Sequence, residues 1–194
     1  MLKSICVFCG SNTGVLPEYK QQAEELGLLI AQRGLRLVYG GGNVGLMGVI
    51  ADTVLQHKGQ VTGVIPDFLM RKEVGHKGLT EQIIVQTMHE RKQKMAELSD
   101  AFIVLPGGIG TMEEFFEVFT WGQLGLHNKP FAVLNSGGYY NHLLAFLDLA
   151  VDHKFLSSAN RNMIITDTET QALFTKIDNY EPPALEKWMA YLQT

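Results

Sequence analysis

Short apolar runs alternate with longer amphipathic runs along most of this 194-residue chain, and this alternation constrains the fold more than any other feature. The strand-like runs lie at residues 3–9, 35–39, 60–65, 82–86, 101–105, 130–134 and 162–166. The helix-like runs lie near residues 18–33, 45–58, 88–98, 112–124, 138–153 and 168–178. This order predicts an α/β fold with a doubly wound, mostly parallel, Rossmann-like sheet in a single domain.

The domain is expected to occupy residues 1–180, followed by a C-terminal helical tail at residues 181–194. Leu185, Trp188, Met189 and Leu192 fall on one face of that tail helix. Such an apolar stripe packs either on its own domain or on a second subunit. The segment 66–79 is the longest polar connection and is either a lid or a solvated loop.

A glycine-rich segment, residues 106–114 (PGGIGTMEE), follows the apolar run at 101–105 and precedes a helix-like run. Free N–H groups in the first turn of a helix attract a phosphate, and glycines let a ligand approach the backbone closely. The acids at 113, 114 and 117 also suit any helix N-terminus. Glycines are a costly way to begin a helix that only packs, so the segment favours an anion site with a carboxylate beside it.

A second glycine cluster, residues 40–45 (GGGNVG), follows the run at 35–39 and fits the pattern of a dinucleotide site. Asp67 lies roughly where the ribose-binding acid of such a site is expected. A Walker A loop is excluded, because Leu46 and Met47 stand where Lys and Ser or Thr are required. Because ligands bind beyond the carboxyl ends of parallel strands, Gly10, Gly40–Gly42 and Gly107–Gly108 should meet at one crevice.

Positive charge for a ligand phosphate is available at residues 88–92 (MHERK), which follow the apolar run near 82–86. Arg91 can grip a phosphate with two donors, whereas Lys92 is a point charge. His89 and Glu90 lack the second histidine of a zinc-protease helix, and the other histidines show no ligand spacing, so no metal site is expected.

Composition excludes several classes of protein. The net charge of −4 gives no reason to expect a nucleic acid or an anionic membrane as a partner. No apolar stretch has the length of a membrane span and none resembles a signal peptide, so a cytoplasmic location is expected. Cys6 and Cys9 form a Cys-x-x-Cys at a strand end, where buried thiols are more typical than a redox pair.

Residues 88–92 and 106–114 together resemble the paired signature of the LOG (Lonely Guy) family of cytokinin riboside 5′-monophosphate phosphoribohydrolases. Residues 7–11 (VFCGS), 37–42 (LVYGGG), 45–48 (GLMG) and 120–125 (TWGQLG), with Lys129 and Pro130, match the family pattern in the same order. The resemblance extends from about residue 3 to about residue 178. Ile109 stands where plant members often have an aromatic residue, which bears on the preferred base rather than on the reaction.

The resemblance implies a Rossmann-like fold, a homodimer with sites near the subunit interface, no cofactor, and hydrolysis of an adenosine 5′-monophosphate to free base and ribose 5-phosphate. It implies that Arg91 and Glu114 are the catalytic pair. The expected substrate-binding residues are Gly10, Ser11, Gly41, Gly42, Glu73, Met88, Lys92, Gly107, Gly108, Ile109, Gly110, Thr111, Met112, Glu113 and Thr120. AMP and its N6-prenylated derivatives both remain candidate substrates.

Physical chemistry favours the same reaction. Positive charge develops on the ribose as the bond to the base breaks, and a carboxylate such as Glu114 stabilises that charge or activates the attacking water. Two alternatives remain: a nucleotide-binding or carrier protein without catalytic activity, and a dinucleotide-dependent oxidoreductase using residues 40–45 and Asp67. The lysine decarboxylase label carried by related proteins has no support, since no motif for a pyridoxal phosphate site is recognisable.

Overall fold

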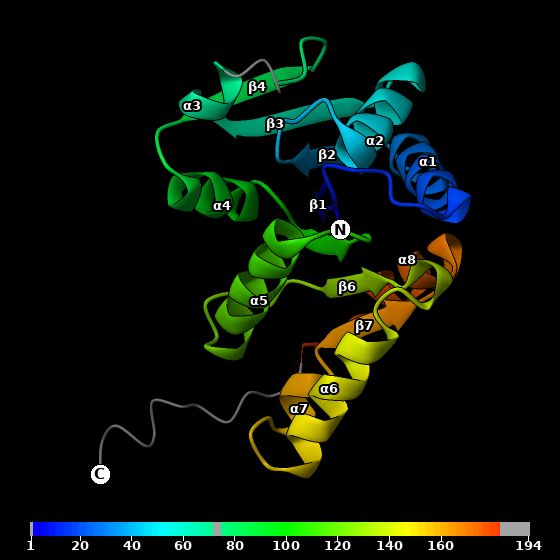
Figure 1. Ribbon diagram of the computed structural model, residues 1–194, viewed down its shortest axis with the longest axis vertical. Helices are drawn as coiled ribbons and strands as arrows, with labels where there is room; N and C mark the ends of the chain where they lie inside the picture. Colours follow the sequence, from blue (N-terminus) through cyan, green and yellow to red (C-terminus); the bar gives the residue numbers. More distant parts are fainter. Residues whose placement is uncertain (1, 72–74, 183–194) are drawn as a thin grey trace.

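The computed structural model describes residues 2–71 and 75–182, and its elements follow the predicted alternation (Figure 1). The strands are β1 (Ser4–Phe8), β2 (Arg36–Tyr39), β3 (Gln60–Pro66), β4 (Glu81–Val85), β5 (Ala101–Val104), β6 (Phe131–Leu134) and β7 (Ile164–Asp167). The main helices are α1 (Pro17–Gln32), α2 (Gly45–Gln56), α4 (Met88–Glu97), α5 (Ile109–Gln123), α6 (Asn141–Asp152) and α8 (Thr170–Asp178). Three short helical segments complete the order: α3 (Asp67–Met70), η1 (Ser136–Gly138) and α7 (Ser158–Arg161).

All seven strands form one parallel sheet in the order β4-β3-β2-β1-β5-β6-β7, which confirms the predicted fold class. The chain winds outward from β1 to β4 and then returns to place β5 on the other side of β1. The order therefore reverses between β1 and β5, where Phe8 lies opposite Val104. In open α/β sheets this reversal opens a crevice at the carboxyl ends of the strands, and ligands bind there.

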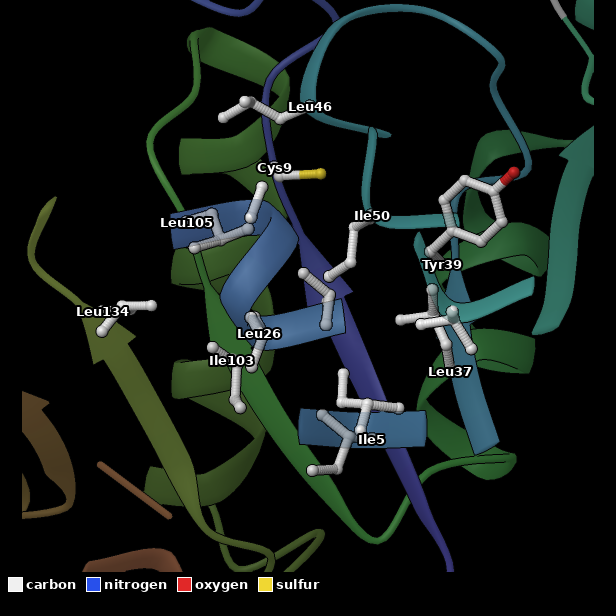
Figure 2. Close-up of a cluster of buried hydrophobic side chains, with 14 of the residues drawn as sticks. Ile5, Cys9, Leu26, Leu37, Tyr39, Leu46, Ile50, Ile103, Leu105 and Leu134 are labelled. Atoms are coloured by element: carbon white, nitrogen blue, oxygen red, sulfur yellow. The ribbon is translucent and has the colours of Figure 1, made fainter. Parts of the chain in front are cut away.

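Two apolar layers enclose the sheet. Helices α1, α2 and α8 pack on one face, and α4, α5 and α6 pack on the other. Figure 2 shows the first layer, where Ile5, Ile103 and Leu134 of three strands lie beside Leu26 of α1 and Ile50 of α2. The central strands β1 and β5 are buried along their whole length, as expected for parallel strands covered on both faces.

The structure differs from the predicted secondary structure in two segments, the start of α5 and residues 66–79. Helix α5 begins at Ile109 rather than at residue 112, so Gly110 lies inside the first turn of the helix. The segment 66–79 is not a plain loop, because it contains α3 and because Gly75 forms a bridge with Gly42. The predicted C-terminal tail helix and its apolar stripe lie outside the described residues.

No helix in residues 2–71 and 75–182 is both long and apolar enough to cross a bilayer.

Candidate active site

A cavity of about 250 Å³ opens at the point where the strand order reverses. Its wall comes from the end of β1, the turn after β2, the start of α2 and the first turns of α5, and Arg91 of α4 completes it. The lining residues are Val7, Cys9, Gly10, Ser11, Gly40, Met47, Arg91, Gly108, Ile109, Gly110, Thr111 and Glu114. The predicted crevice therefore exists. Both parts of the paired signature contribute to it, residues 88–92 through Arg91 and residues 106–114 through the start of α5.

The N-terminus of α5 supplies backbone donors to this cavity. Gly108 is the N-cap residue and has no side chain with which to cap the helix. The first backbone bond of the helix runs from the Met112 N–H to the Gly108 carbonyl at 3.1 Å. The N–H groups of residues 109–111 precede that bond and have no partner within the helix. Free N–H groups at a helix N-terminus, together with the helix dipole, favour an anionic group.

Arg91 is fixed at the other side of the cavity by two backbone carbonyls. Thr87 and Glu90 form a capping box that starts α4, so Arg91 lies in its first turns. The Arg91 Nε donates to the Val64 carbonyl at 3.2 Å, and Nη2 donates to the Gly40 carbonyl at 3.4 Å. A Cβ at residue 40 would overlap the guanidinium, so only glycine permits this approach. The side chain is 11% exposed and therefore largely preorganised.

Glu114 is the carboxylate of the cavity. It lies on α5 with 10% of its side chain exposed, and its Oε1 is 3.6 Å from Nη2 of Arg91. Burial raises the pKa of Glu114 to about 7, although the Arg91 guanidinium opposes this rise. A carboxyl group that titrates near neutral pH is suited to both accepting and donating a proton, as acid–base catalysis requires.

The raised pKa also predicts a pH-dependent stability. The Glu114 carboxyl titrates near its ordinary value of 4.5 in the unfolded chain and near about 7 in the fold. Between these values the folded state holds a proton that the unfolded state has released, so the free energy of unfolding falls as pH rises. We expect Glu114→Gln to gain about 3 kcal/mol over wild type as the pH rises from about 4.5 to about 8. Urea unfolding at several pH values measures this difference, and a constant difference would contradict the buried-carboxyl account.

Lys92 turns away from the cavity, toward the outer side of α5. Its ammonium is buried and pairs with Glu113 and with Oε2 of Glu117, the latter at 2.8 Å. Burial lowers the pKa of Lys92, but hydrogen bonds with Glu113 and Glu117 outweigh this effect and raise it. Lys92 thus ties α4 to α5 and holds the helices that carry Arg91 and Glu114. The predicted contact of Lys92 and Glu113 with a substrate stays a prediction.

The other predicted site residues divide into two groups. The cavity wall includes Gly10, Ser11, Gly108, Ile109, Gly110 and Thr111. The wall does not include Gly41, Gly42, Met88, Gly107, Met112 or Thr120. Of these, Met88 touches a wall residue, because its sulfur lies 3.9 Å from Nη1 of Arg91, whereas the Gly42 carbonyl accepts from the Tyr39 hydroxyl at 3.1 Å. Glu73 lies outside the described residues.

Sequence reasoning placed Gly40 at the crevice without naming it as a substrate contact, and it missed Val7, Cys9 and Met47 as wall residues. Gly40 carries a usable signal, since it is the first residue after β2 and the carboxyl ends of strands form the crevice. Cys9 carries the same signal, because it is the first residue after β1. Burial raises the pKa of its thiol far above the ordinary value, which makes the thiol unreactive.

The alternative dinucleotide site gains no support from the geometry around Asp67. Its carboxylate pairs with Arg71 at 2.7 Å, and Asp67 does not belong to the cavity wall. The glycines at 41 and 42 are engaged with the chain itself, because the Gly41 carbonyl accepts from the His76 N–H at 2.9 Å.

Two curated relatives are similar to this chain over nearly all of its length. Cytokinin riboside 5′-monophosphate phosphoribohydrolase LOG7 of Arabidopsis thaliana is 48% identical over 180 residues, which are 93% of this chain and 83% of that protein. The cytokinin riboside 5′-monophosphate phosphoribohydrolase of Rhodococcoides fascians is 49% identical over 90% of this chain and 89% of that protein. The chain belongs to this family, the LOG family. The resemblance seen in the sequence motifs is thereby confirmed.

The LOG-family chain also matches a family model described as "Possible lysine decarboxylase" over residues 47–177. That range contains Arg91 and Glu114 but begins after Gly10 and Gly40, so the model covers only part of the cavity wall.

Solved structures show the same fold at low identity. The molybdenum cofactor binding protein of Rippkaea orientalis has a TM-score of 0.70 and 22% identity, over 92% of this LOG-family chain and 97% of that chain. The Moco carrier protein of Chlamydomonas reinhardtii has a TM-score of 0.68 and 17% identity, over 92% and 97% of the two chains. Similarity at this level concerns the fold and not the ligand.

Proposed function

We propose that this chain hydrolyses the N-glycosidic bond of an adenosine 5′-monophosphate, N6-substituted or not, to a free base and ribose 5-phosphate. Relatives that are 48% and 49% identical to it carry the name of that activity. The observation that carries the proposal is the Arg91–Glu114 pair, buried in the same cavity as the open N-terminus of α5. A site that only binds phosphate has no need of a carboxyl group buried beside it, because a carboxylate repels an anion.

The anion site and the carboxyl group have the spacing that such a substrate requires. Glu114 lies one helical turn beyond Thr111, so both project from the start of α5 into the same cavity. A 5′-phosphate bound at residues 108–111 would bring the attached ribose toward Glu114. Binding energy at the phosphate would then fix the sugar where the reaction occurs.

The reaction breaks the bond between the ribose C1′ and the base nitrogen, and a water molecule forms the new bond to C1′. The bonding electron pair leaves with the base, so positive charge develops on the sugar before the water attacks. The Glu114 carboxylate stabilises this charge and accepts a proton from the water. The departing base takes up one proton, so nucleotide and water yield base and ribose 5-phosphate.

In this proposal Arg91 acts as a fixed cation. Its bonds to the Gly40 and Val64 carbonyls hold the guanidinium in the cavity wall. From there it favours the ionised form of Glu114 and offers a donor to the substrate. The same attraction opposes the rise in the Glu114 pKa that burial causes.

We also propose that two copies associate through the outer face of α5 and α6. Both helices pack on the same face of the sheet and expose Phe116, Phe146 and Leu149, and Leu124 at the C-terminal end of α5 is exposed as well. Large apolar side chains that are exposed on one face of a domain are available for an interface between proteins. Ile109 connects this face with the cavity, because it lies at the start of α5, lines the cavity and is 86% exposed.

Sedimentation equilibrium tests this association. We expect the mass of two chains in the low micromolar range, because burial of four large apolar residues favours association. A Phe146→Glu variant should shift the distribution toward the monomer. A wild-type chain with monomeric mass throughout that range would contradict the proposal.

Chromatography of the free base tests the proposed activity. The purified chain is incubated separately with AMP, with N6-isopentenyladenosine monophosphate and with adenosine. We expect base from at least one nucleotide and much less from adenosine, which lacks the group that α5 would bind. Binding of the nucleotides without release of base would instead favour a carrier.

A further inference from the structure

Two adjacent tyrosines hold the loop that leads into α5. Tyr139 and Tyr140 follow η1, just before α6. The Tyr139 hydroxyl donates to the Gly107 carbonyl at 2.6 Å, and the Tyr140 hydroxyl donates to the Leu105 carbonyl at 2.7 Å. Neither tyrosine belongs to the cavity wall. They reach the loop from outside the site.

The Pro106 carbonyl, which lies between those of Leu105 and Gly107, also accepts a hydrogen bond. The Gly10 N–H donates to the Pro106 carbonyl at 3.0 Å. Three consecutive carbonyls, at residues 105–107, are therefore bonded by donors from other parts of the chain. The structure thus fixes the orientation of each peptide group in the loop.

The orientation of a carbonyl determines that of the next N–H, because a trans peptide group is planar and its C=O and N–H point in opposite directions. The bond from Tyr139 to the Gly107 carbonyl thus turns the Gly108 N–H away from Tyr139. Gly108 lines the cavity and Tyr139 does not. The bond from Tyr140 has no such consequence, because the residue after Leu105 is a proline and carries no N–H.

The Tyr139 ring is itself held in place. It packs edge-on against Tyr19 of α1, with ring centroids 5.7 Å apart, and against Tyr140 at 4.9 Å. The Tyr140 N–H is held by the Asn135 side chain at 2.7 Å. Tyr139 is nevertheless 44% exposed, so loss of its hydroxyl alone leaves neither a cavity nor a deeply buried polar group.

We propose that Tyr139 is a positioning residue that aims the Gly107–Gly108 peptide N–H at the 5′-phosphate of the substrate. This assignment rests on the proposed function, since it presumes that the anion bound at α5 is the phosphate of a nucleotide. Tyr139 acts through the backbone and does not touch the substrate. Its hydroxyl therefore affects affinity for the phosphate more than the chemistry at C1′.

The test compares Tyr139→Phe with Tyr140→Phe, which removes an equivalent hydroxyl from the same loop. Calorimetry gives the affinities of each variant for ribose 5-phosphate and for adenosine. We expect Tyr139→Phe to weaken ribose 5-phosphate binding about three- to tenfold, the worth of one neutral hydrogen bond, and to leave adenosine binding unchanged. With AMP as substrate, KM should rise by a similar factor while kcat stays within about twofold.

Tyr140→Phe should lower thermal stability, because its buried partner carbonyl loses a donor, without a selective effect on ribose 5-phosphate. Equal effects of the two variants on ribose 5-phosphate, or equal loss of both ligands in Tyr139→Phe, would overturn the proposal. Unchanged ribose 5-phosphate binding would do so too. If wild type binds ribose 5-phosphate but releases no base, the proposed hydrolysis fails while the comparison of variants still judges Tyr139. If wild type does not bind ribose 5-phosphate, the proposal for Tyr139 fails, whereas release of base from the nucleotide still decides the proposed hydrolysis.

Discussion

Glu114→Gln should lower turnover of the nucleotide by on the order of a hundredfold or more, while the nucleotide still binds. The amide is nearly the same size as the carboxyl group, so the buried cavity keeps its shape. It has no negative charge to stabilise the developing cation on the ribose, and it cannot accept a proton from water. In the proposed site the phosphate binds the N–H groups at the start of α5, which the substitution leaves in place. Single-turnover kinetics and calorimetry separate the two effects.

Glu117→Gln is the matched control for this variant. Glu117 lies on the same helix one turn away, but it pairs with Lys92 and is not part of the cavity wall. Lys92 retains Glu113 as a partner, so we expect turnover within about threefold of wild type. Near-normal turnover in Glu114→Gln, or equal losses in both variants, would remove Glu114 from its proposed role.

Arg91→Ala should lose both binding and turnover, with kcat/KM reduced by on the order of a thousandfold. The guanidinium is the one cation among the described residues that line the cavity, so its removal takes from Glu114 its ion-pair partner and from the substrate a charged donor. Arg91→Lys should recover little, because a single ammonium cannot reproduce the two bonds to Val64 and Gly40. Steady-state kinetics of the three proteins measure the effect.

Gly40→Ala tests the position of the guanidinium rather than its presence. The added methyl group would overlap Arg91 and displace it from the cavity wall. If this is its main effect, Gly40→Ala combined with Arg91→Ala should be hardly worse than Arg91→Ala alone. Fully additive losses would show that Gly40 acts independently of Arg91. Unchanged kinetics in Arg91→Ala would instead make Arg91 an ordinary residue of the helix surface.

The doubly wound parallel sheet and the location of the crevice at the carboxyl ends of its strands could both be predicted from the sequence. Parallel strands buried on both faces give unbroken apolar runs, and the glycine clusters follow those runs, so both features are readable without coordinates. The Arg91–Glu114 pair could be expected as well, from the family resemblance and because both residues lie in the first turns of helices that follow strands.

The partners of individual side chains could not be predicted, because they depend on how the helices pack. Arg91 and Lys92 are neighbours in the chain, yet α4 directs one toward the cavity and the other toward Glu113 and Glu117. In the same way, only Gly40 of the three consecutive glycines touches the guanidinium and lines the cavity. The role of Tyr139 was also out of reach, since its partner Gly107 lies far away in the sequence.

The proposed hydrolysis of the bond between the ribose C1′ and the base is tested most directly by following oxygen from labelled water into the products. Purified protein is incubated with AMP or N6-isopentenyladenosine monophosphate in ¹⁸O-enriched water, and the products are analysed at once by mass spectrometry. Hydrolysis at C1′ predicts free base and ribose 5-phosphate in equal amounts, with the label on the sugar and none on the base. Unchanged nucleotide, or a nucleoside with labelled inorganic phosphate, would contradict the account.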